Sequence, residues 1–170
     1  MSYAQLFYHM VWATKNRAPL ISTEIEPVIY AYVARKVIAL GGKVFALNGM
    51  QDHTHLVSSI PSRIAVATFI GQVKSVSSAQ LNSSAIAADH FAWQEEYGVF
   101  SFDGKRLPQY IAYVEKQKEH HGANTIIPIL ERYESDRAGD VHESQTEYSI
   151  EGDIDLQSDF FLTDVVPKGG

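Results

Sequence analysis

The 170-residue sequence contains no cysteine. Disulfide bonds, thiolate zinc sites and cysteine nucleophiles are therefore excluded, and histidine and oxygen atoms remain as metal ligands. No apolar run approaches the roughly 18 residues of a membrane span, and the N-terminus has no basic region followed by a long apolar run. Since 45% of the residues are hydrophobic, we expect one cytoplasmic domain with a buried core.

An excess of positive charge is also missing. The formal net charge is -6, which is unusual for a nucleic-acid-binding protein. The acidity is confined to one end, because residues 1–133 hold 12 Lys and Arg against 10 Asp and Glu, whereas residues 134–170 hold 2 against 10. We therefore expect a folded domain over 1–133 and an acidic, disordered tail over 134–170, which is either a solvated extension or a segment that competes with DNA. The first part can carry a local basic surface, for which the candidates are Lys15, Arg17, Lys74, Lys105 and Arg106.

Strand-type and helix-type patterns alternate along the first 121 residues. Short runs rich in β-branched and aromatic residues predict strands at 5–13, 43–48, 54–60 and 97–102. Apolar residues at helical spacing predict helices from about Thr23 to Gly41, from a cap at Pro61-Ser62 to about Leu81, and from Pro108 to about His121, where Gly122 ends the helix. This order predicts an α+β, ferredoxin-like fold: an antiparallel sheet with two helices on one face and an added C-terminal helix.

A His-x-His sequence opens the third predicted strand. Alternate residues of a strand project from the same face, so the imidazoles of His53 and His55 can approach one metal ion. Imidazole binds several transition metals, so the spacing does not name the metal. The motif is weak by itself, because two histidines at a sheet edge can equally serve as hydrogen-bonding groups.

A tyrosine and a glutamine lie four residues apart on the last predicted helix. Tyr113 and Gln117 therefore share a helix face and point toward one site. The alternative is that Tyr113 is a core aromatic residue in a stripe with Tyr110 and Val114. The joint occurrence of this pair and the histidine pair favours a functional site.

Four segments in order resemble the IS200/IS605-type tyrosine (Y1, HUH) transposases, including their REP-associated relatives. They are Tyr-His-Met-Val-Trp-Ala-Thr-Lys-Asn-Arg at 8–17, Asp-His-Thr-His-Leu-Val at 52–57, Lys-Ser-Val-Ser-Ser at 74–78 and Tyr-Val-Glu-Lys-Gln-Lys-Glu-His-His at 113–121. The resemblance covers roughly residues 3–133. Thr54 departs from it, because the family has a hydrophobic residue between the histidines, but this side chain is expected to point away from the metal.

The resemblance implies a chemistry and a partner. His53, His55 and Gln117 would ligate Mg²⁺ or Mn²⁺, and Tyr113 would attack single-stranded DNA to form a 5′-phosphotyrosine, which a 3′-hydroxyl can later displace. It also implies hairpin-containing DNA ends as partner and a homodimer in which the tyrosine helix completes the site of the other protomer. The rival interpretations are a non-catalytic nucleic-acid-binding module, a replication initiator or relaxase with the same chemistry, and a metal-dependent hydrolase that uses water.

Overall fold

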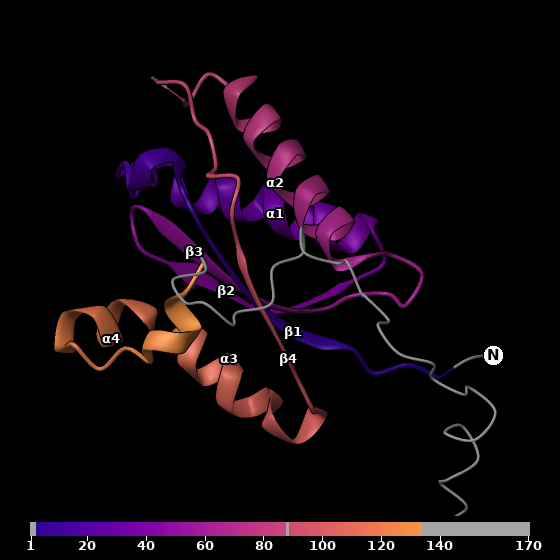
Figure 1. The fold of residues 1–170 in the computed structure, drawn as a ribbon. Helices are drawn as coiled ribbons and strands as arrows, with labels where there is room; N and C mark the ends of the chain where they lie inside the picture. Colours follow the sequence, from indigo (N-terminus) through magenta and orange to yellow (C-terminus); the bar gives the residue numbers. More distant parts are fainter. Residues whose placement is uncertain (1–2, 88, 134–170) are drawn as a thin grey trace, which may run out of the picture. The chain divides into compact units, whose positions relative to one another are not determined.

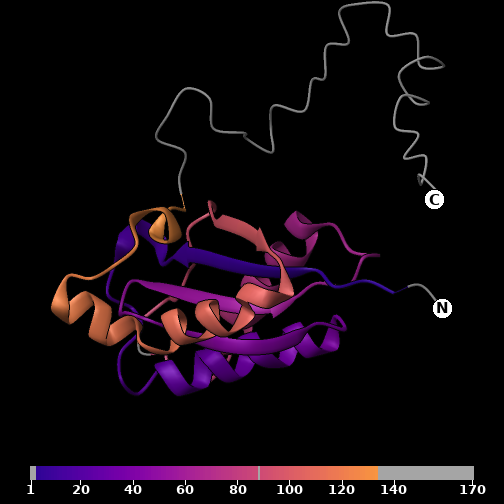
Figure 2. The ribbon, with the colours of Figure 1, turned by 90° about the horizontal axis from the view of Figure 1, so that it is seen from below.

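The computed structural model describes residues 3–87 and 89–133, so the predicted acidic tail lies outside the described residues. One antiparallel sheet has the strand order β2-β3-β1-β4, with β1 between β3 and β4 (Figure 2). Its strands are β1 (Phe7–Ala13), β2 (Lys43–Gly49), β3 (His53–Ser59) and β4 (Gly98–Phe102). Helix α1 (Glu26–Ala39) joins β1 to β2, and α2 (Val66–Asn82) joins β3 to β4. This connectivity confirms the predicted ferredoxin-like α+β fold (Figure 1).

The two faces of the sheet carry different side chains. On one face, Met10, Trp12 and Leu56 pack with residues of α1 and α2, among them Val33 and Phe69, in the main hydrophobic core. Because successive strand residues point to opposite faces, the residues between them face the other way. The predicted apolar spacing of both helices therefore corresponds to the residues that cover this face.

The opposite face of the sheet is covered by helix α3 (Leu107–Glu115), which is followed by α4 (Gln117–Ala123). Val57 of β3 packs there with Tyr113 and Val114 of α3 in a second, smaller cluster. His53 and His55 alternate with Thr54 along β3 and therefore lie on the same side as Val57. Thr54 points to the α1 side, as expected.

Several predicted boundaries were wrong. Helix α2 begins at Val66 rather than at the Pro61-Ser62 cap, because residues 61–64 close a turn in which the Ile64 N–H donates to the Pro61 carbonyl oxygen at 3.0 Å. The last helix does not run unbroken to His121, since the backbone leaves helical geometry at Lys116 and divides it into α3 and α4.

The break and the end of the last helix each have a local cause. At the break, the side-chain amide of Asn48 from β2 donates to the Glu115 carbonyl oxygen at 2.9 Å and takes the place of a helical partner. The helix continues past Gly122 to Ala123, where Asn124 adopts the left-handed conformation with φ 54°. Asparagine tolerates that conformation better than most residues, so it ends the helix in place of glycine.

A short C-terminal segment returns to the sheet. The 3-10 turn η3 (Pro128–Glu131) contacts β1 and β4. At Gly98, a Cβ atom would lie 1.8 Å from the Arg132 carbonyl oxygen, so only glycine permits this close crossing. The crossing brings η3 to the α3 side of the sheet.

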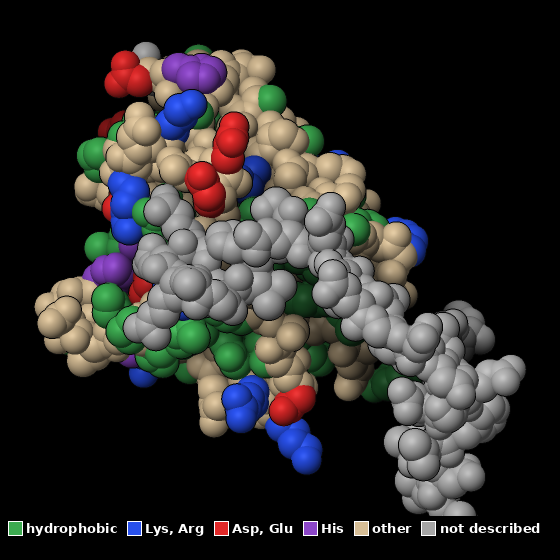
Figure 3. Space-filling model, in the orientation of Figure 1, with side chains coloured by type: hydrophobic (Ala, Val, Ile, Leu, Met, Phe, Trp, Pro, Cys, Tyr) green, Lys and Arg blue, Asp and Glu red, His purple; other side chains and the backbone are tan. Residues whose placement is uncertain are grey.

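The described part of the chain contains no helix long and apolar enough to cross a membrane. Where described side chains are visible on the face shown in Figure 3, Lys and Arg side chains stand singly or beside acidic ones.

Candidate active site

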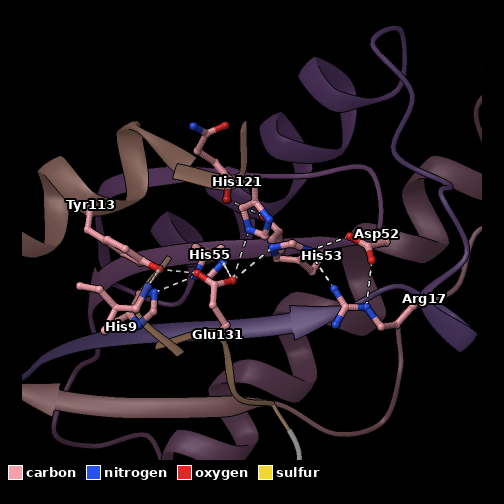
Figure 4. Close-up of polar contacts among 11 residues, drawn as sticks. His9, Arg17, Asp52, His53, His55, Tyr113, His121 and Glu131 are labelled. Atoms are coloured by element: carbon pink, nitrogen blue, oxygen red, sulfur yellow. Dashed lines mark hydrogen bonds and ion pairs between the residues drawn. The ribbon is translucent and has the colours of Figure 1, made fainter. Parts of the chain in front are cut away.

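The two histidines of β3 form the centre of the site. Their side chains are buried, and the ring centroids of His53 and His55 lie 5.2 Å apart with the rings nearly perpendicular. Each ring has its Nδ1 atom engaged: His53 Nδ1 lies 2.7 Å from Asp52 Oδ1, and His55 Nδ1 lies 2.9 Å from His9 Nε2. The Nε2 atoms of both rings are left to face Glu131 (Figure 4).

Asp52 and His9 contact the Nδ1 atoms of His53 and His55, on the opposite side of each ring from Glu131. Arg17 Nε donates to the second carboxylate oxygen of Asp52 at 2.8 Å. Burial opposes ionisation of Asp52, but the hydrogen bonds from Arg17 and His53 outweigh it and lower the pKa of this carboxyl group. Burial, followed by the neighbouring His55, lowers the pKa of His9 to about 3, so His9 supports its partner as a neutral ring.

Glu131 of η3 occupies the middle of the site. Its Oε2 atom lies 3.1 Å from His55 Nε2, 3.4 Å from His53 Nε2 and 3.5 Å from His121 Nε2 (Figure 4). The side chain is only 15% exposed. Burial opposes ionisation of this carboxyl group, but the neighbouring His53 and His55 rings lower its pKa well below the usual range.

Tyr113 of α3 reaches the same carboxylate from the other side. Its hydroxyl donates to Glu131 Oε1 and accepts the Ile127 backbone N–H at 3.0 Å. The His120 ring stacks on the phenol with a centroid distance of 5.0 Å. Burial, together with the hydrogen bond to Glu131, raises the pKa of Tyr113 to about 12, so the phenol is protonated at neutral pH.

Four residues of the site have buried polar atoms that lack hydrogen-bond partners among the described residues. The atoms are His9 Nδ1, His53 Nε2, His121 Nε2, and both the nitrogen and the oxygen of the Gln117 side-chain amide. Gln117 opens α4 and is fully buried. Buried polar atoms are rarely left alone, so these groups indicate a ligand.

The donor atoms fit a metal ion. Single ligand atoms of His53, His55 and Glu131 lie within 4.8 Å of one another. Atoms bound to one ion at about 2.0–2.2 Å stand roughly 3–3.5 Å apart, and the nitrogen-to-oxygen distances above fall in that range. Two imidazoles with oxygen donors therefore form a suitable binding set for a divalent cation.

Comparison with known proteins identifies the family. Residues 2–117 match the sequence pattern of the family described as "Transposase IS200 like". The chain belongs to the IS200-like transposase family. The histidine pair, Tyr113 and Gln117 of this IS200-like transposase lie inside the matched range, whereas Glu131 lies beyond it. No curated protein matches its sequence.

Solved structures share the fold of the transposase. A candidate transposase from Deinococcus radiodurans R1 is 22% identical and superposes with a TM-score of 0.54 over 69% of this chain and 95% of that one. A REP-associated tyrosine transposase bound to a REP hairpin is 12% identical, with a TM-score of 0.55 over 72% of this chain and 75% of that one. At these identities, the similarity supports the fold alone.

The five basic residues predicted to form a DNA-contacting surface have different surroundings. Lys74 is buried, and its ammonium group donates to the backbone carbonyl oxygens of Glu95 and Glu96 at 2.7 and 3.2 Å. Arg17 is paired with Asp52. The other three are exposed and form no ion pair within the described residues; they are Lys15, Lys105 and Arg106.

A hollow of about 260 Å³ opens beside the nucleophile candidate. It lies between α3 and the segment leading into η3, and Arg106, Tyr110 and Tyr113 are on its wall. A second hollow, of about 670 Å³, has Phe7 and Lys105 on its wall. The exposed residues Arg106 and Lys105 therefore each line a hollow next to α3 that is open to a ligand.

Sequence reasoning missed four residues of the site. Asp52 and His9 belong to the motifs that carried the resemblance, but no spacing rule pairs them with the histidines. His121 ends the last segment that carried the resemblance, and its ring centroid lies 4.9 Å from that of His53. Glu131 carried no signal in the sequence, because only the return of η3 to the sheet brings it there.

Proposed function

We propose that this IS200-like transposase cleaves and rejoins single-stranded DNA through Tyr113, with a divalent metal ion held by His53, His55 and Gln117. One observation carries the proposal: the Tyr113 hydroxyl and both Nε2 atoms converge on a single carboxylate from different sides. A tyrosine that only filled the core would not need to place its hydroxyl there. The unpartnered amide of Gln117 supports its inclusion among the ligands.

The reaction is a transesterification at phosphorus. The Tyr113 oxygen attacks the scissile phosphate, the bond from phosphorus to the 3′-oxygen breaks, and the product is a 5′-phosphotyrosine with a free 3′-hydroxyl. One proton leaves the phenol and one ends on the 3′-oxygen, so no further reactant is consumed. When bound, the ion would act as a Lewis acid that stabilises charge on the phosphate oxygens. Reversal onto another 3′-hydroxyl rejoins the strand.

The residues of the chain prepare this reaction by fixing geometry. Asp52 and His9 hold the histidine rings, and Ile127 holds the phenol. Burial of the histidines limits access of water, which would otherwise compete for the phosphotyrosine. The raised pKa of Tyr113 means that its proton must be released as the reaction proceeds.

Single-stranded or hairpin DNA is the proposed substrate. The REP-associated relative with the same fold is bound to a REP hairpin. Arg106 stands on the wall of the hollow beside Tyr113, and the Tyr110 ring stacks on Phe102 at a centroid distance of 3.9 Å. A basic residue and aromatic rings together suit a phosphate and an unstacked base. Lys15 and Lys105 are proposed as further phosphate contacts.

A covalent-trapping experiment tests the function. The full chain is incubated with Mn²⁺ and labelled single-stranded hairpin DNA, and a protein–DNA adduct is sought on a denaturing gel. We expect an adduct with the wild type, none with Tyr113→Phe, and a normal yield with the control Tyr32→Phe, which removes a hydroxyl from α1 on the other face of the sheet. An adduct of normal yield with Tyr113→Phe would refute the role of this tyrosine.

A further inference from the structure

We infer that Glu131 binds the divalent ion through one carboxylate oxygen and holds the Tyr113 hydroxyl with the other, so that one side chain joins the ion to the nucleophile. This inference rests on the proposed function, and it adds a ligand that comes from outside the family-matched range. Glu131 is a positioning residue for Tyr113.

The two carboxylate oxygens have separate partners. Oε2 faces the Nε2 atoms of both strand histidines, while Oε1 accepts the Tyr113 hydroxyl. A carboxylate that only neutralised a histidine would not need a different partner for each of its two oxygens. An ion placed among Oε2 and the two Nε2 atoms would leave Oε1 free to keep its hydrogen bond to the phenol.

The contacts of His53 leave one ring nitrogen for a cation. Its Nδ1 atom lies 2.7 Å from the Asp52 carboxylate and 3.3 Å from the Arg17 guanidinium, so this nitrogen is already engaged. Its buried Nε2 atom has no hydrogen-bond partner among the described residues and lies 3.4 Å from Glu131 Oε2. A metal ion between these two atoms would take both as ligands.

The burial of Glu131 leads to the same conclusion. Its side chain is 15% exposed, and its Oε2 atom lies within 3.5 Å of a ring nitrogen of each of three histidines. A buried carboxylate needs compensating positive charge, and a divalent cation shared with these rings would supply it.

The backbone around Glu131 fixes the phenol as well. The Ile127 N–H and the Glu131 carboxylate both contact the Tyr113 hydroxyl, so two groups of one short segment hold it. The close crossing at Gly98 holds this segment against β4 through Arg132. Tyr113 is thereby held at a defined position relative to the ion's ligands.

Titration with Mn²⁺ alone tests the inference without relying on activity. The dissociation constant of Mn²⁺ is measured for the full-length wild type, Glu131→Gln, His53→Ala and the control Glu119→Gln, which makes the same change on the exposed side of α4. We expect at least about tenfold weaker binding for Glu131→Gln, because even groups that only orient a metal ligand are worth about 10–100-fold. Glu119→Gln should bind as the wild type does.

The results separate this inference from the proposed function. Normal or tighter Mn²⁺ binding by Glu131→Gln, with binding lost in His53→Ala, would overturn this inference but not the proposed function. It would indicate that, in the DNA-free protein, the Glu131 carboxylate only occupies the place of the scissile phosphate. If the wild type binds no Mn²⁺, both the inference and the proposed metal site fall. If Glu131→Gln does not fold, Glu131→Asp keeps the charge but shortens the reach, and unchanged affinity in that variant also overturns the inference.

The contact with Tyr113 has its own readout. At a Mn²⁺ concentration that saturates each protein, adduct formation by Glu131→Gln should remain at least about tenfold slower than in the wild type, because a misplaced nucleophile slows a reaction even when the ion is bound. A rate restored fully by saturating Mn²⁺ would contradict the positioning role.

Discussion

Asp52 connects three residues of the site. It receives the Arg17 guanidinium on one oxygen and His53 Nδ1 on the other, so the orientation of His53 depends on a carboxylate that is itself held by a salt bridge. His55 depends in the same way on His9. Such supporting groups fix which ring nitrogen carries the proton, and therefore which nitrogen is free to bind a metal ion.

Asp52→Asn should weaken Mn²⁺ binding by about 10–100-fold, the usual cost of losing a carboxylate behind a metal-binding histidine. The amide can also orient its nitrogen toward His53 and favour the wrong tautomer. Mn²⁺ titration measures the effect, and Asp89→Asn makes the same change at an exposed position as a control. Equal affinities for the two variants would contradict the supporting role of Asp52.

At the scale of single residues, only part of the site could be predicted from the sequence. Strand periodicity put His53 and His55 on one face, because this rule acts over a few residues. The helical spacing that paired Tyr113 with Gln117 assumes one continuous helix, and the structure breaks the helix at Lys116 between them. Glu131 was not predictable, since its place depends on a chain reversal after α4 and on the crossing at Gly98. Contacts of that kind are tertiary and leave no local pattern.

At the scale of elements, Lys74 links α2 to the segment before β4. Its ammonium group donates to the carbonyl oxygens of Glu95 and Glu96, and the charge lies close to the Tyr97 ring. Burial lowers the pKa of Lys74 to about 8 despite the nearby glutamates. A buried lysine bound to backbone is better explained as a structural link than as a phosphate contact.

Lys74→Ala should therefore lower the free energy of unfolding by about 1–3 kcal/mol, because two carbonyl groups lose a charged donor. Between about pH 8 and the ordinary lysine value of 10.5, the unfolded wild type holds a proton that the folded protein has released. Raising the pH through this window should thus stabilise the wild type relative to the variant. Urea unfolding measures both effects.

Lys105→Ala serves as the comparison for Lys74→Ala, because Lys105 is exposed in the turn before α3. It should leave the free energy of unfolding unchanged and weaken binding of single-stranded DNA. If Lys74→Ala were as stable as the wild type and only its DNA binding suffered, the structural interpretation of Lys74 would be wrong.

The order of elements followed from the sequence because hydrophobic period changes between strand and helix at each boundary. The predicted helix boundaries were wrong where contact with another segment decides the local backbone geometry. Asn48 of β2 stabilises the break after Glu115, and the 61–64 turn delays the start of α2. Neither effect is visible in the periodicity of the affected helix.

At the scale of the whole molecule, one chain brings the tyrosine and both strand histidines to the same carboxylate. Tyr113 and the two histidines meet Glu131 within a single protomer. The resemblance predicts a homodimer with exchanged tyrosine helices, and dimerisation stays a prediction. The single-chain arrangement supports a tyrosine that works in its own protomer.

A mixing experiment distinguishes the two arrangements. His53→Ala and Tyr113→Phe should each be inactive, and co-expression of the two should remain inactive if each tyrosine serves its own histidines. The measurement is adduct formation with hairpin DNA, with size-exclusion light scattering to report whether mixed dimers form. Clear recovery of adduct in mixed dimers would show instead that the tyrosine acts on the partner's site.

The most direct test of the whole account is to locate the DNA on the protein. The covalent adduct formed with Mn²⁺ and single-stranded hairpin DNA is digested with nuclease and protease, and mass spectrometry identifies the residue that carries the nucleotide. We expect a 5′-phosphate ester on Tyr113. A nucleotide on any other residue, or DNA cleaved with no adduct at any stage, would contradict it.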